Sequence, residues 1–217
     1  MLSKRLKTVA DLVTKGNIVA DVGTDHGYVP IYLVEEDISP FVYAMDVNEG
    51  PLNKAKINIA ERELEDKIET ILSDGFDSFG DRKVDTVIIS GMGGDLIVDI
   101  LSRASDFDEL ILSPHKRVDL VRKYLADNGY AIVDEKMVEE RNKYYQIIKA
   151  KKGECLLLKE EEVMYGPFLL KHKDEKLKAF LEHEYKKLSK IKSELEREDK
   201  ELDKEIEFLK SALAYYK

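Results

Sequence analysis

The sequence predicts an α/β protein with a mostly parallel β-sheet, an antiparallel hairpin at the edge of that sheet, and a C-terminal α-helical coiled-coil domain. Residues 1–150 alternate short apolar runs with helix-length segments, which is typical of βαβ units and a parallel sheet. Residues 130–138 and 144–149 are strand-like, and their connection is too short for a parallel crossover, so they form a hairpin. After Gly153 the chain becomes rich in Lys and Glu, and residues 173–217 contain neither Gly nor Pro.

The expected elements follow from the apolar pattern in order along the chain. Strands are expected at residues 18–21, 41–46, 68–72, 84–90 and 110–113, each a short run rich in apolar side chains. Helices are expected at residues 27–36, 50–64, 95–104 and 118–128, the last of them with Gly129 as its C-cap. The change in composition after this alternation places one ligand-binding domain at residues 1–153 and a second, helical domain at residues 154–217.

Two sets of apolar residues in the helical domain repeat at spacings of three and four. The first set is Leu177, Leu181, Tyr185, Leu188, Ile191 and Leu195, and the second is Leu202, Ile206, Leu209, Leu213 and Tyr216. Such seams are typical of coiled coils. We expect two helices that fold back on each other near residues 196–200, because each seam then has a partner within the chain. This arrangement favours a monomer, although pairing between two chains fits the same pattern.

Composition and charge limit the classes of function. The net charge of −9 comes entirely from residues 1–150, and an acidic domain disfavours broad, non-specific binding to nucleic acids. No apolar run approaches the ~18 residues of a membrane span, and the N-terminus lacks the apolar core of a secretion signal. The single Cys155 excludes an internal disulfide, and the four histidines lack the spacing of a metal site. We expect a soluble, cytoplasmic protein that holds no metal.

Acidic residues lie at the ends of three successive expected strands, at the edge where parallel α/β sheets bind ligands. Asp21 opens the segment Asp21-Val22-Gly23-Thr24-Asp25-His26-Gly27, whose glycines let the backbone approach a ligand. Its carboxylates would repel a pyrophosphate, but they suit a ligand with an ammonium and a sulfonium, as in S-adenosylmethionine. Asp46 suits ribose hydroxyls, and Asp74-Gly75 suits an adenine amino group. Each position could instead be an ordinary turn or helix cap.

The segment Ser90-Gly91-Met92-Gly93-Gly94 follows the fourth expected strand. Its three glycines allow a flat substrate to approach the backbone, although such a turn could also be purely structural. The segment is not the Asp/Asn-Pro-Pro-aromatic sequence found at this place in enzymes that methylate exocyclic amines. It is therefore consistent with methylation of a ring nitrogen, whose in-plane lone pair needs little polarisation.

These segments closely resemble the bacterial tRNA (adenine(22)-N1)-methyltransferase family. The resemblance covers essentially the whole chain, and its most specific elements are Asp21–Pro30 and Ser90–Gly94. Further matching segments are Asp46–Pro51, Asp74-Gly75, Leu2–Leu6, Tyr144–Ile148 and Tyr165-Gly166-Pro167. The resemblance implies a Rossmann-like class I S-adenosylmethionine-dependent methyltransferase. It also implies that the enzyme methylates N1 of an adenine in the D-loop region of tRNA, at position 22.

The resemblance also implies which residues carry the function. By the resemblance, S-adenosylmethionine would be bound by Asp21, Gly23, Asp46, Val47, Asp74 and Gly75, and we also expect Thr24, Ser90 and Gly91 to bind it. Met92, Gly93 and Gly94 would line the edge shared by the methyl donor and the target base. The chain departs from the family pattern at Ser113-Pro114-His115, where Gln-Pro-Asn is frequent, at Gln146, where Glu is usual, and at Gly27, where Ala is common. These departures affect details on the substrate side and not the cofactor assignment.

Asp25 is the candidate for stabilising the positive charge on the methylated base, and His26 could orient the base or take a proton from N6. His26 could equally be a packed histidine at a helix start. Binding of tRNA needs a basic surface despite the acidic total. The candidates are Arg5 with Lys4 and Lys7; His115, Lys116 and Arg117 with Arg122 and Lys123; and residues 171–192, including Lys186 and Lys187. The last region could instead be a solvated helix face.

Two other functions fit the same sequence. A methyltransferase of the same fold that acts on a small molecule would use the cofactor without RNA. A non-enzymatic scaffold would bind the cofactor without methylating any RNA, and its coiled coil would recruit another protein.

Overall fold

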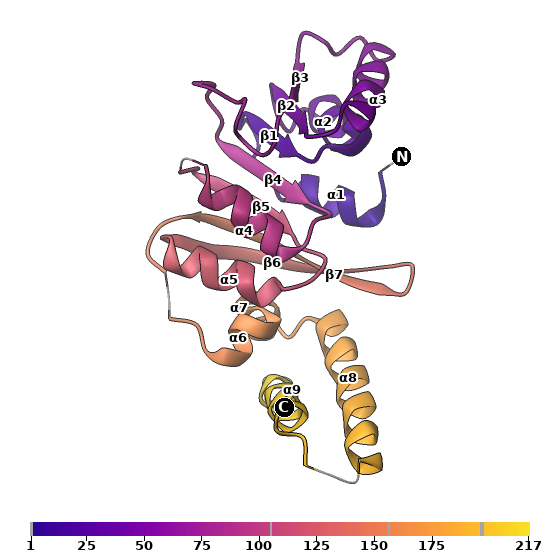
Figure 1. Cartoon of the computed structure of the whole chain (residues 1–217), viewed down its shortest axis with the longest axis vertical. Coiled ribbons are helices and arrows are strands. Elements are labelled where there is room, and N and C mark those ends of the chain that lie inside the picture. Colours follow the sequence, from indigo (N-terminus) through magenta and orange to yellow (C-terminus); the bar gives the residue numbers. More distant parts are fainter. Residues whose placement is uncertain (1, 105, 156, 196–197) are drawn as a thin grey trace.

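The structure is a computed structural model that describes residues 2–104, 106–155, 157–195 and 198–217. These residues form a seven-stranded sheet in the order β3-β2-β1-β4-β5-β7-β6 (Figure 1). The strands are β1 (Val19–Val22), β2 (Val42–Asp46), β3 (Ile68–Leu72), β4 (Thr86–Ser90), β5 (Glu109–Ser113), β6 (Tyr130–Glu140) and β7 (Lys143–Lys152). β1 to β5 run parallel, and β7 runs antiparallel to both β5 and β6. The expected α/β sheet and its antiparallel edge hairpin are confirmed.

Helices cover the two faces of the sheet. α1 (Lys4–Asp11), α2 (Tyr28–Glu35) and α3 (Glu49–Ala60) pack on one face, and α4 (Gly94–Ser102) and α5 (Val118–Asp127) pack on the other. β1 and β5 are buried along their whole length, because the helices exclude water from both faces of the central strands. Continuous apolar runs, as opposed to alternating ones, therefore mark the centre of this sheet in the sequence.

Three short helices lie where the sequence analysis predicts no element. α1 begins after Ser3, whose hydroxyl accepts a hydrogen bond from the Leu6 amide at 3.3 Å. α6 (Glu160–Tyr165) and α7 (Pro167–Lys171) follow the edge hairpin and lead to the C-terminal helices. α6 and α7 have only one or two turns, which is too short to produce a helical repeat of apolar residues. α1 does have such a repeat, because Leu2, Leu6, Val9 and Val13 recur at spacings of three and four and pack into the core, and the sequence analysis overlooked it.

The C-terminal helices α8 (Glu175–Glu194) and α9 (Lys200–Ala214) pack against each other below the sheet in the view of Figure 1. Leu181 of α8 is buried with Ile206 and Leu209 of α9, and all three belong to the expected seams. Side chains of Asp174 and Asp199 cap the two helices by accepting hydrogen bonds from their first amides. The expected pair of helices is therefore present. Residues 196 and 197 of the expected turn lie outside the described residues.

A buried ion pair joins the sheet to α6 and α7. Arg122 of α5 and Glu135 of β6 both have fully buried side chains, with Nη2 of Arg122 2.8 Å from Oε1 of Glu135. Nη1 of Arg122 donates to the carbonyls of Val163 at 2.9 Å and Met164 at 3.1 Å, and Nη2 donates to the amide oxygen of Gln146. A buried guanidinium is tolerated here because its Nε, Nη1 and Nη2 atoms all donate to acceptors. The expectation that Arg122 belongs to a basic RNA-binding surface is therefore wrong.

The same ion pair explains the Tyr165-Gly166-Pro167 segment. A Cβ atom on Gly166 would lie 2.6 Å from Oε2 of Glu135 and 2.8 Å from Nη2 of Arg122, and Gly166 has a φ of +102°. The amide of Phe168, just beyond, donates to Oε2 of Glu135 at 2.9 Å. This segment is therefore shaped by packing against the buried pair.

The described residues include neither a membrane-spanning helix nor a metal-binding cluster. Their helices include none that is both long enough and apolar enough to cross a membrane. Nor do they bring together three side chains that could bind a metal ion.

Candidate active site

The candidate site lies at the carboxyl ends of the parallel strands. Strand register aligns Val22 with Met45 and Ile89, Asp46 with Leu72, and Ser90 with Ser113. The segments that follow these residues therefore leave the sheet at one common edge (Figure 1). This brings together the three acidic strand ends and the glycine-rich loop that the sequence analysis singles out. Ligands of open α/β sheets bind at this edge.

Asp21 is the most perturbed group of this edge. Burial raises the pKa of its carboxyl to about 7, with a further rise from the nearby Asp46 carboxylate and a partial decrease from the Thr24 hydroxyl. Within the described residues, three buried side-chain atoms have no hydrogen-bond partner: Oδ2 of Asp21, Oγ1 of Thr24 and Oγ of Ser113. The Thr24 hydroxyl lies near Asp21 but does not form a hydrogen bond with its carboxyl. Buried polar atoms are normally paired, so Asp21 and Thr24, which lie close together, are candidates for contact with a ligand, whereas Ser113 lies two strands away on β5.

Gly23 brings the first and fourth strand ends into contact. It has a φ of +76°, and a Cβ atom there would lie 2.3 Å from Cε of Met92. The amides of Gly23 and Thr24 both donate to the carbonyl of Met45, at 2.8 and 2.9 Å. The loop after β1 is therefore fixed to the end of β2 while it lies against the glycine-rich loop.

The other two acids differ in their surroundings. Asp46 is buried, and its Oδ1 accepts a hydrogen bond from the Asn48 amide at 2.8 Å. The neighbouring Val47 is 59% exposed, which leaves an apolar surface beside this carboxylate. Asp74 is exposed, and its Oδ1 lies 3.2 Å from Nη2 of Arg103, at the end of α4.

Arg103 is a neighbour of the site that sequence reasoning missed. Its guanidinium also contacts Asp77 at 3.2 Å and Asp99 at 3.3 Å, so it joins two carboxylates that follow β3 to one on α4. Its i,i+4 spacing from Asp99 was a weak local signal, whereas its contact with Asp74 depends on the tertiary fold.

Asp25 and His26 form a short turn, η1 (Asp25–Gly27), with unusual backbone geometry. Their φ values are +31° and +70°, and Gly27 follows at +72°. Left-handed backbone is uncommon outside glycine and concentrates at functional sites. Nε2 of His26 lies 3.3 Å from Oδ1 of Asp25, whose side chain is 74% exposed.

Packing against two helices holds this turn in place. The side-chain amide of Asn58, in α3, donates to the carbonyl of His26 at 2.9 Å. A Cβ atom on Gly27 would lie 3.1 Å from Cβ of Ala55, also in α3. The His26 ring stacks on Tyr28, the first residue of α2, with 5.5 Å between centroids. Asn58 is thus a supporting residue that sequence reasoning missed.

The glycine-rich loop pairs with the loop after β5 through backbone hydrogen bonds. The Gly91 amide donates to Ser113 at 3.2 Å, the His115 amide to Met92 at 2.8 Å, and the Gly94 amide to Lys116 at 2.9 Å. A Cβ atom on Gly94 would lie 2.3 Å from the carbonyl oxygen of Arg117. Gly94 is therefore buried in this pairing, whereas Gly91 is exposed.

Arg5, His115 and Tyr145 meet beside this loop, and we call them the Arg5–His115–Tyr145 cluster. Nη1 of Arg5 lies 3.5 Å from Oγ of Ser90, and the Arg5 guanidinium lies 5.2 Å from the centre of the Tyr145 ring. The His115 ring lies 5.5 Å from the same ring. Burial, Arg5 and Lys143 lower the pKa of His115, which favours the neutral imidazole. Tyr145 is a site neighbour that we did not single out from the sequence.

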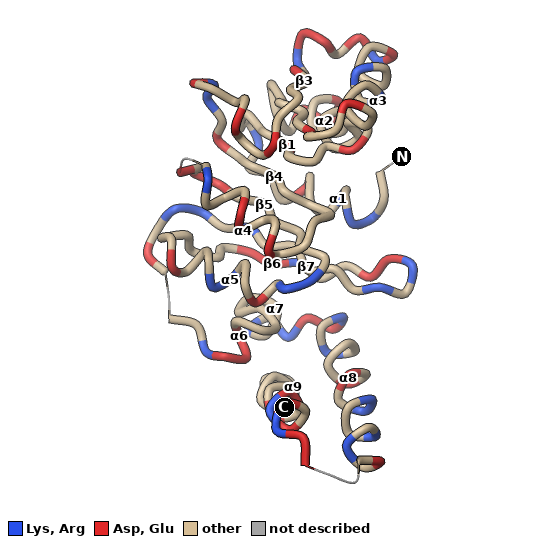
Figure 2. The backbone as a smooth tube through the Cα atoms, viewed as in Figure 1, with Lys and Arg blue, Asp and Glu red and all other residues tan. Residues whose placement is uncertain are grey.

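The remaining candidates for RNA contact lie at two places. Lys116 and Arg117 follow His115, and Arg117 lies 3.4 Å from Asp95 and 3.6 Å from Asp119. Lys186 and Lys187 lie on α8, below the sheet in the view of Figure 1, and Nζ of Lys187 lies 3.0 Å from Glu184. Figure 2 shows lysines along α8 and basic residues at the tip of the β6–β7 hairpin.

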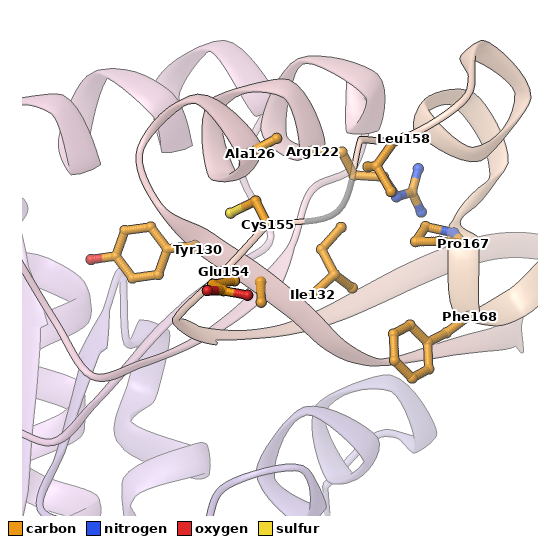
Figure 3. Close-up of a pocket in the computed structure, with 10 residues that line it drawn as sticks. Arg122, Ala126, Tyr130, Ile132, Glu154, Cys155, Leu158, Pro167 and Phe168 are labelled. Atoms are coloured by element: carbon orange, nitrogen blue, oxygen red, sulfur yellow. The ribbon is translucent and has the colours of Figure 1, made fainter.

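A cavity of about 120 Å³ lies elsewhere, between α5, β6 and α7 (Figure 3). Its lining is mostly apolar and includes Tyr130, Ile132, Cys155 and Phe168. None of the residues that the sequence analysis assigns to the cofactor or the base lines it. The cavity is therefore separate from the candidate active site.

The strand order, the antiparallel last pair, the acids at adjacent strand ends and the glycine-rich loops together define a class I S-adenosylmethionine-dependent methyltransferase. Comparison with known proteins gives the family. The family model of the tRNA (adenine(22)-N(1))-methyltransferase TrmK matches residues 19–217. The chain is 33% identical over 182 residues to the tRNA (adenine(22)-N(1))-methyltransferase of Bacillus subtilis (strain 168), covering 80% of this chain and 76% of the relative.

Two solved structures are similar along nearly the whole chain. Sp1610 of Streptococcus pneumoniae has a TM-score of 0.92 at 35% identity, over 98% of this chain and 100% of that one. TrmK of M. capricolum, solved with S-adenosylhomocysteine, has a TM-score of 0.91 at 30% identity, over 100% of both chains. The chain therefore belongs to the tRNA (adenine(22)-N(1))-methyltransferase family. The resemblance, the Rossmann-like fold, the enzyme class, the activity and the cofactor expected from the sequence are confirmed.

Proposed function

We propose that the carboxyl edge holds S-adenosylmethionine on the β1–β3 side and presents the target adenine on the β4–β5 side. The proposed cofactor-binding residues are Asp21, Gly23, Thr24, Asp46, Val47, Asp74, Gly75, Ser90 and Gly91. The observation that carries this proposal is the pair of buried polar atoms without partners, Oδ2 of Asp21 and Oγ1 of Thr24, beside Gly23, where a Cβ atom has no space. An ammonium group would satisfy both atoms, and a carboxylate is the partner it prefers.

Asp46 and Asp74 fit the remaining parts of the cofactor. The Asp46 carboxylate is fixed by the Asn48 amide and keeps a second oxygen for ribose hydroxyls. Val47 offers exposed apolar surface on which an adenine ring can lie. Arg103 orients the Asp74 carboxylate, which we assign to the adenine amino group. These side chains therefore fit S-adenosylmethionine in their chemistry as well as in their order along the sheet edge.

The chain's own residues position the base and accommodate its charge. When bound, the cofactor supplies an electrophilic methyl group. Adenine N1 carries a lone pair and no proton, so it can accept a methyl group without a general base, and positive charge then appears on the base. We assign Asp25, an exposed carboxylate, to stabilising that charge, and His26 to orienting the base. Met92, Gly93 and Gly94 separate the cofactor side from the base side.

A basic surface is proposed to hold the tRNA around this site. We assign Arg5, His115, Lys116 and Arg117 to the nucleotides near the target base, and Lys186 and Lys187 of α8 to phosphates further away. In this proposal residues 154–217 form the recognition domain, α8 and α9 are a coiled coil within one chain, residues 1–153 form the catalytic domain, and the enzyme is a cytoplasmic monomer.

Methyl transfer to an unmodified tRNA transcript tests the activity directly. N1-methyladenine blocks Watson–Crick pairing, so reverse transcription is expected to stop at position 22 after incubation with the enzyme and labelled S-adenosylmethionine. Label in RNA without a stop would keep the enzyme class and reject the N1 assignment. No label, together with intact cofactor binding, would favour a small-molecule methyltransferase or a scaffold.

Calorimetric titration of S-adenosylmethionine tests the site assignment. Asp46→Ala is expected to weaken binding by about tenfold or more, because it removes a charge-assisted hydrogen bond. Asp66→Ala, at an exposed aspartate before the amino end of β3 and so opposite the site, is the control and is expected to bind as the wild type does. Equal affinity of the Asp46 variant and the wild type would refute the assignment.

A further inference from the structure

Tyr145 stands out on β7 because it does not contribute to the core. Its strand neighbours Tyr144, Ile147 and Ile148 all belong to or pack against one of the three core clusters, whereas Tyr145 does not. It is only partly buried. Its ring instead contacts Arg5 and His115, two polar side chains at the ligand-binding edge of the sheet.

The sheet register places this ring at the active-site edge. Leu112 of β5 pairs with Ile148 of β7, so Tyr145 lies beyond the end of β5, beside the loop that pairs with the glycine-rich loop. Side chains alternate along a strand, so Tyr145 faces the α1 side of the sheet, opposite to Tyr144 and Gln146. Tyr144 contacts Phe180 of α8, and Gln146 accepts a hydrogen bond from Arg122, in agreement with this alternation.

Two neighbouring elements contact the ring. Arg5 of α1 lies over the ring and reaches Ser90, at the start of the glycine-rich loop. The amide of Arg5 also donates to Oε2 of Glu140, at the end of β6, at 3.3 Å. His115 contacts the ring from the loop after β5. The cluster therefore has a fixed geometry next to the proposed base side.

We propose that Tyr145 positions the target adenine by aromatic contact within the Arg5–His115–Tyr145 cluster. Extruded bases are held by stacking on aromatic rings and on the planar guanidinium of arginine, and this cluster provides both. The electron-rich ring also suits a base that becomes positively charged on methylation. Arg5 is the cationic member of the cluster, and the lowered pKa of His115 keeps a second positive charge away from the base. The inference rests on the proposed location of the base side and adds a residue that this proposal does not contain.

Steady-state kinetics of Tyr145→Ala and Tyr145→Phe test the proposal. Losing a base–aromatic contact is expected to lower kcat/KM for tRNA by about 5-fold to about 150-fold, whereas Tyr145→Phe keeps the ring and is expected to stay close to the wild type. The Kd for S-adenosylmethionine is expected to remain unchanged in both variants. A loss in Tyr145→Ala that Tyr145→Phe does not restore would overturn the proposal.

The matched control is Tyr32→Ala. Tyr32 of α2 has a similar contact with α1, since Nζ of Lys7 lies 5.2 Å from the centre of its ring. If Tyr145 only anchors α1, the two alanine variants should have similar kinetics and similar thermal stability. Under the proposal, only Tyr145→Ala loses activity toward tRNA. Equal kinetics of the two variants would therefore overturn it.

A tRNA with 2-aminopurine at position 22 gives a readout besides activity. Stacking quenches 2-aminopurine, so complexes of the wild type and of Tyr145→Phe are expected to be dimmer than the complex of Tyr145→Ala. Identical fluorescence in all three complexes would refute the contact. Failure of the proposed function itself is distinguishable, because the wild-type enzyme would then leave no mark at position 22 of an unlabelled tRNA.

Discussion

Lowering the pH from 7 to 6 is expected to weaken the binding of S-adenosylmethionine through one buried carboxyl. Burial raises the pKa of Asp21 to about 7, and we assign this group to the cationic part of the cofactor. A carboxyl with this pKa is about one half ionised at pH 7 and about one tenth ionised at pH 6. If only the ionised form binds, affinity should fall about fivefold over this interval. An α-amino group stays mostly protonated over the same interval, so the titration of the ligand contributes little.

The free energy of unfolding of the cofactor-free enzyme should show the opposite trend and increase as the pH falls. A carboxyl whose pKa is higher in the folded state than in the unfolded chain holds its proton longer when folded. Its contribution to stability is therefore present below about pH 4 and is lost as the pH rises to about 7, with an upper limit of about 4 kcal/mol. The carboxylate that attracts the cofactor thus destabilises the empty enzyme near neutral pH.

Calorimetric titrations at pH 6, 6.5 and 7, together with urea denaturation at the same pH values, test this reasoning. Asp21→Asn removes the titrating group, so its cofactor affinity should be lower than that of the wild type and independent of pH. His26→Gln and His115→Gln are controls for histidine titration and should keep the pH dependence. An affinity of the wild type that does not change between pH 6 and 7, or an unchanged pH dependence in Asp21→Asn, would refute the role of Asp21.

Two further substitutions test other parts of the structure. Arg122→Ala leaves the buried Glu135 carboxylate without its partner and should lower the free energy of unfolding by about 3–5 kcal/mol in urea titrations. The exposed neighbour Lys123→Ala should change it little, and a similarly small effect of Arg122→Ala would contradict the buried pair. The double substitution of Lys186 and Lys187 by Glu should weaken tRNA binding and make it less dependent on salt. The slope of the logarithm of the binding constant against the logarithm of the salt concentration should become shallower by about 0.7–0.9 for each lost phosphate contact. The affinity for the cofactor should not change. The control is the same charge reversal at Lys54 and Lys56, two exposed lysines of α3, which should leave tRNA binding intact. Equal losses of tRNA affinity in the two double variants would instead indicate a general effect of charge.

Local patterns predict most of the sheet because the determining residues are neighbours in sequence. The runs of β1, β2, β4 and β5 are mostly buried and apolar, and each ends at a polar or glycine-containing loop, so position and type follow from the sequence. The edge strand β3 is only partly buried. The acids at the strand ends are equally local. Their convergence on one edge follows from the parallel topology, which the alternation of strands and helices predicts.

The missed and misassigned residues depend on contacts between distant parts of the chain. The sequence suggests a surface cation at Arg122 because its partners lie outside α5, Glu135 on β6 and Gln146 on β7. Tyr145 acquires its surroundings from α1 and from the loop after β5. The pairing of Arg103 with Asp74 spans 29 positions in sequence. The spacing of residues along the chain does not predict such long-range contacts, so only the folded structure reveals them.

The hydrogen bonds between the glycine-rich loop and the loop after β5 make the two loops one structural unit, so we expect them to evolve together. The two loops pack so closely that Gly94 cannot acquire a side chain unless the Arg117 backbone moves, so a change in the shape of one loop shifts the other. Lineages of this enzyme should therefore change the two loops together, so the departure at Ser113-Pro114-His115 is best interpreted alongside its partner loop. Efforts to redirect the enzyme to another base should randomise residues 90–94 and 113–117 in one library.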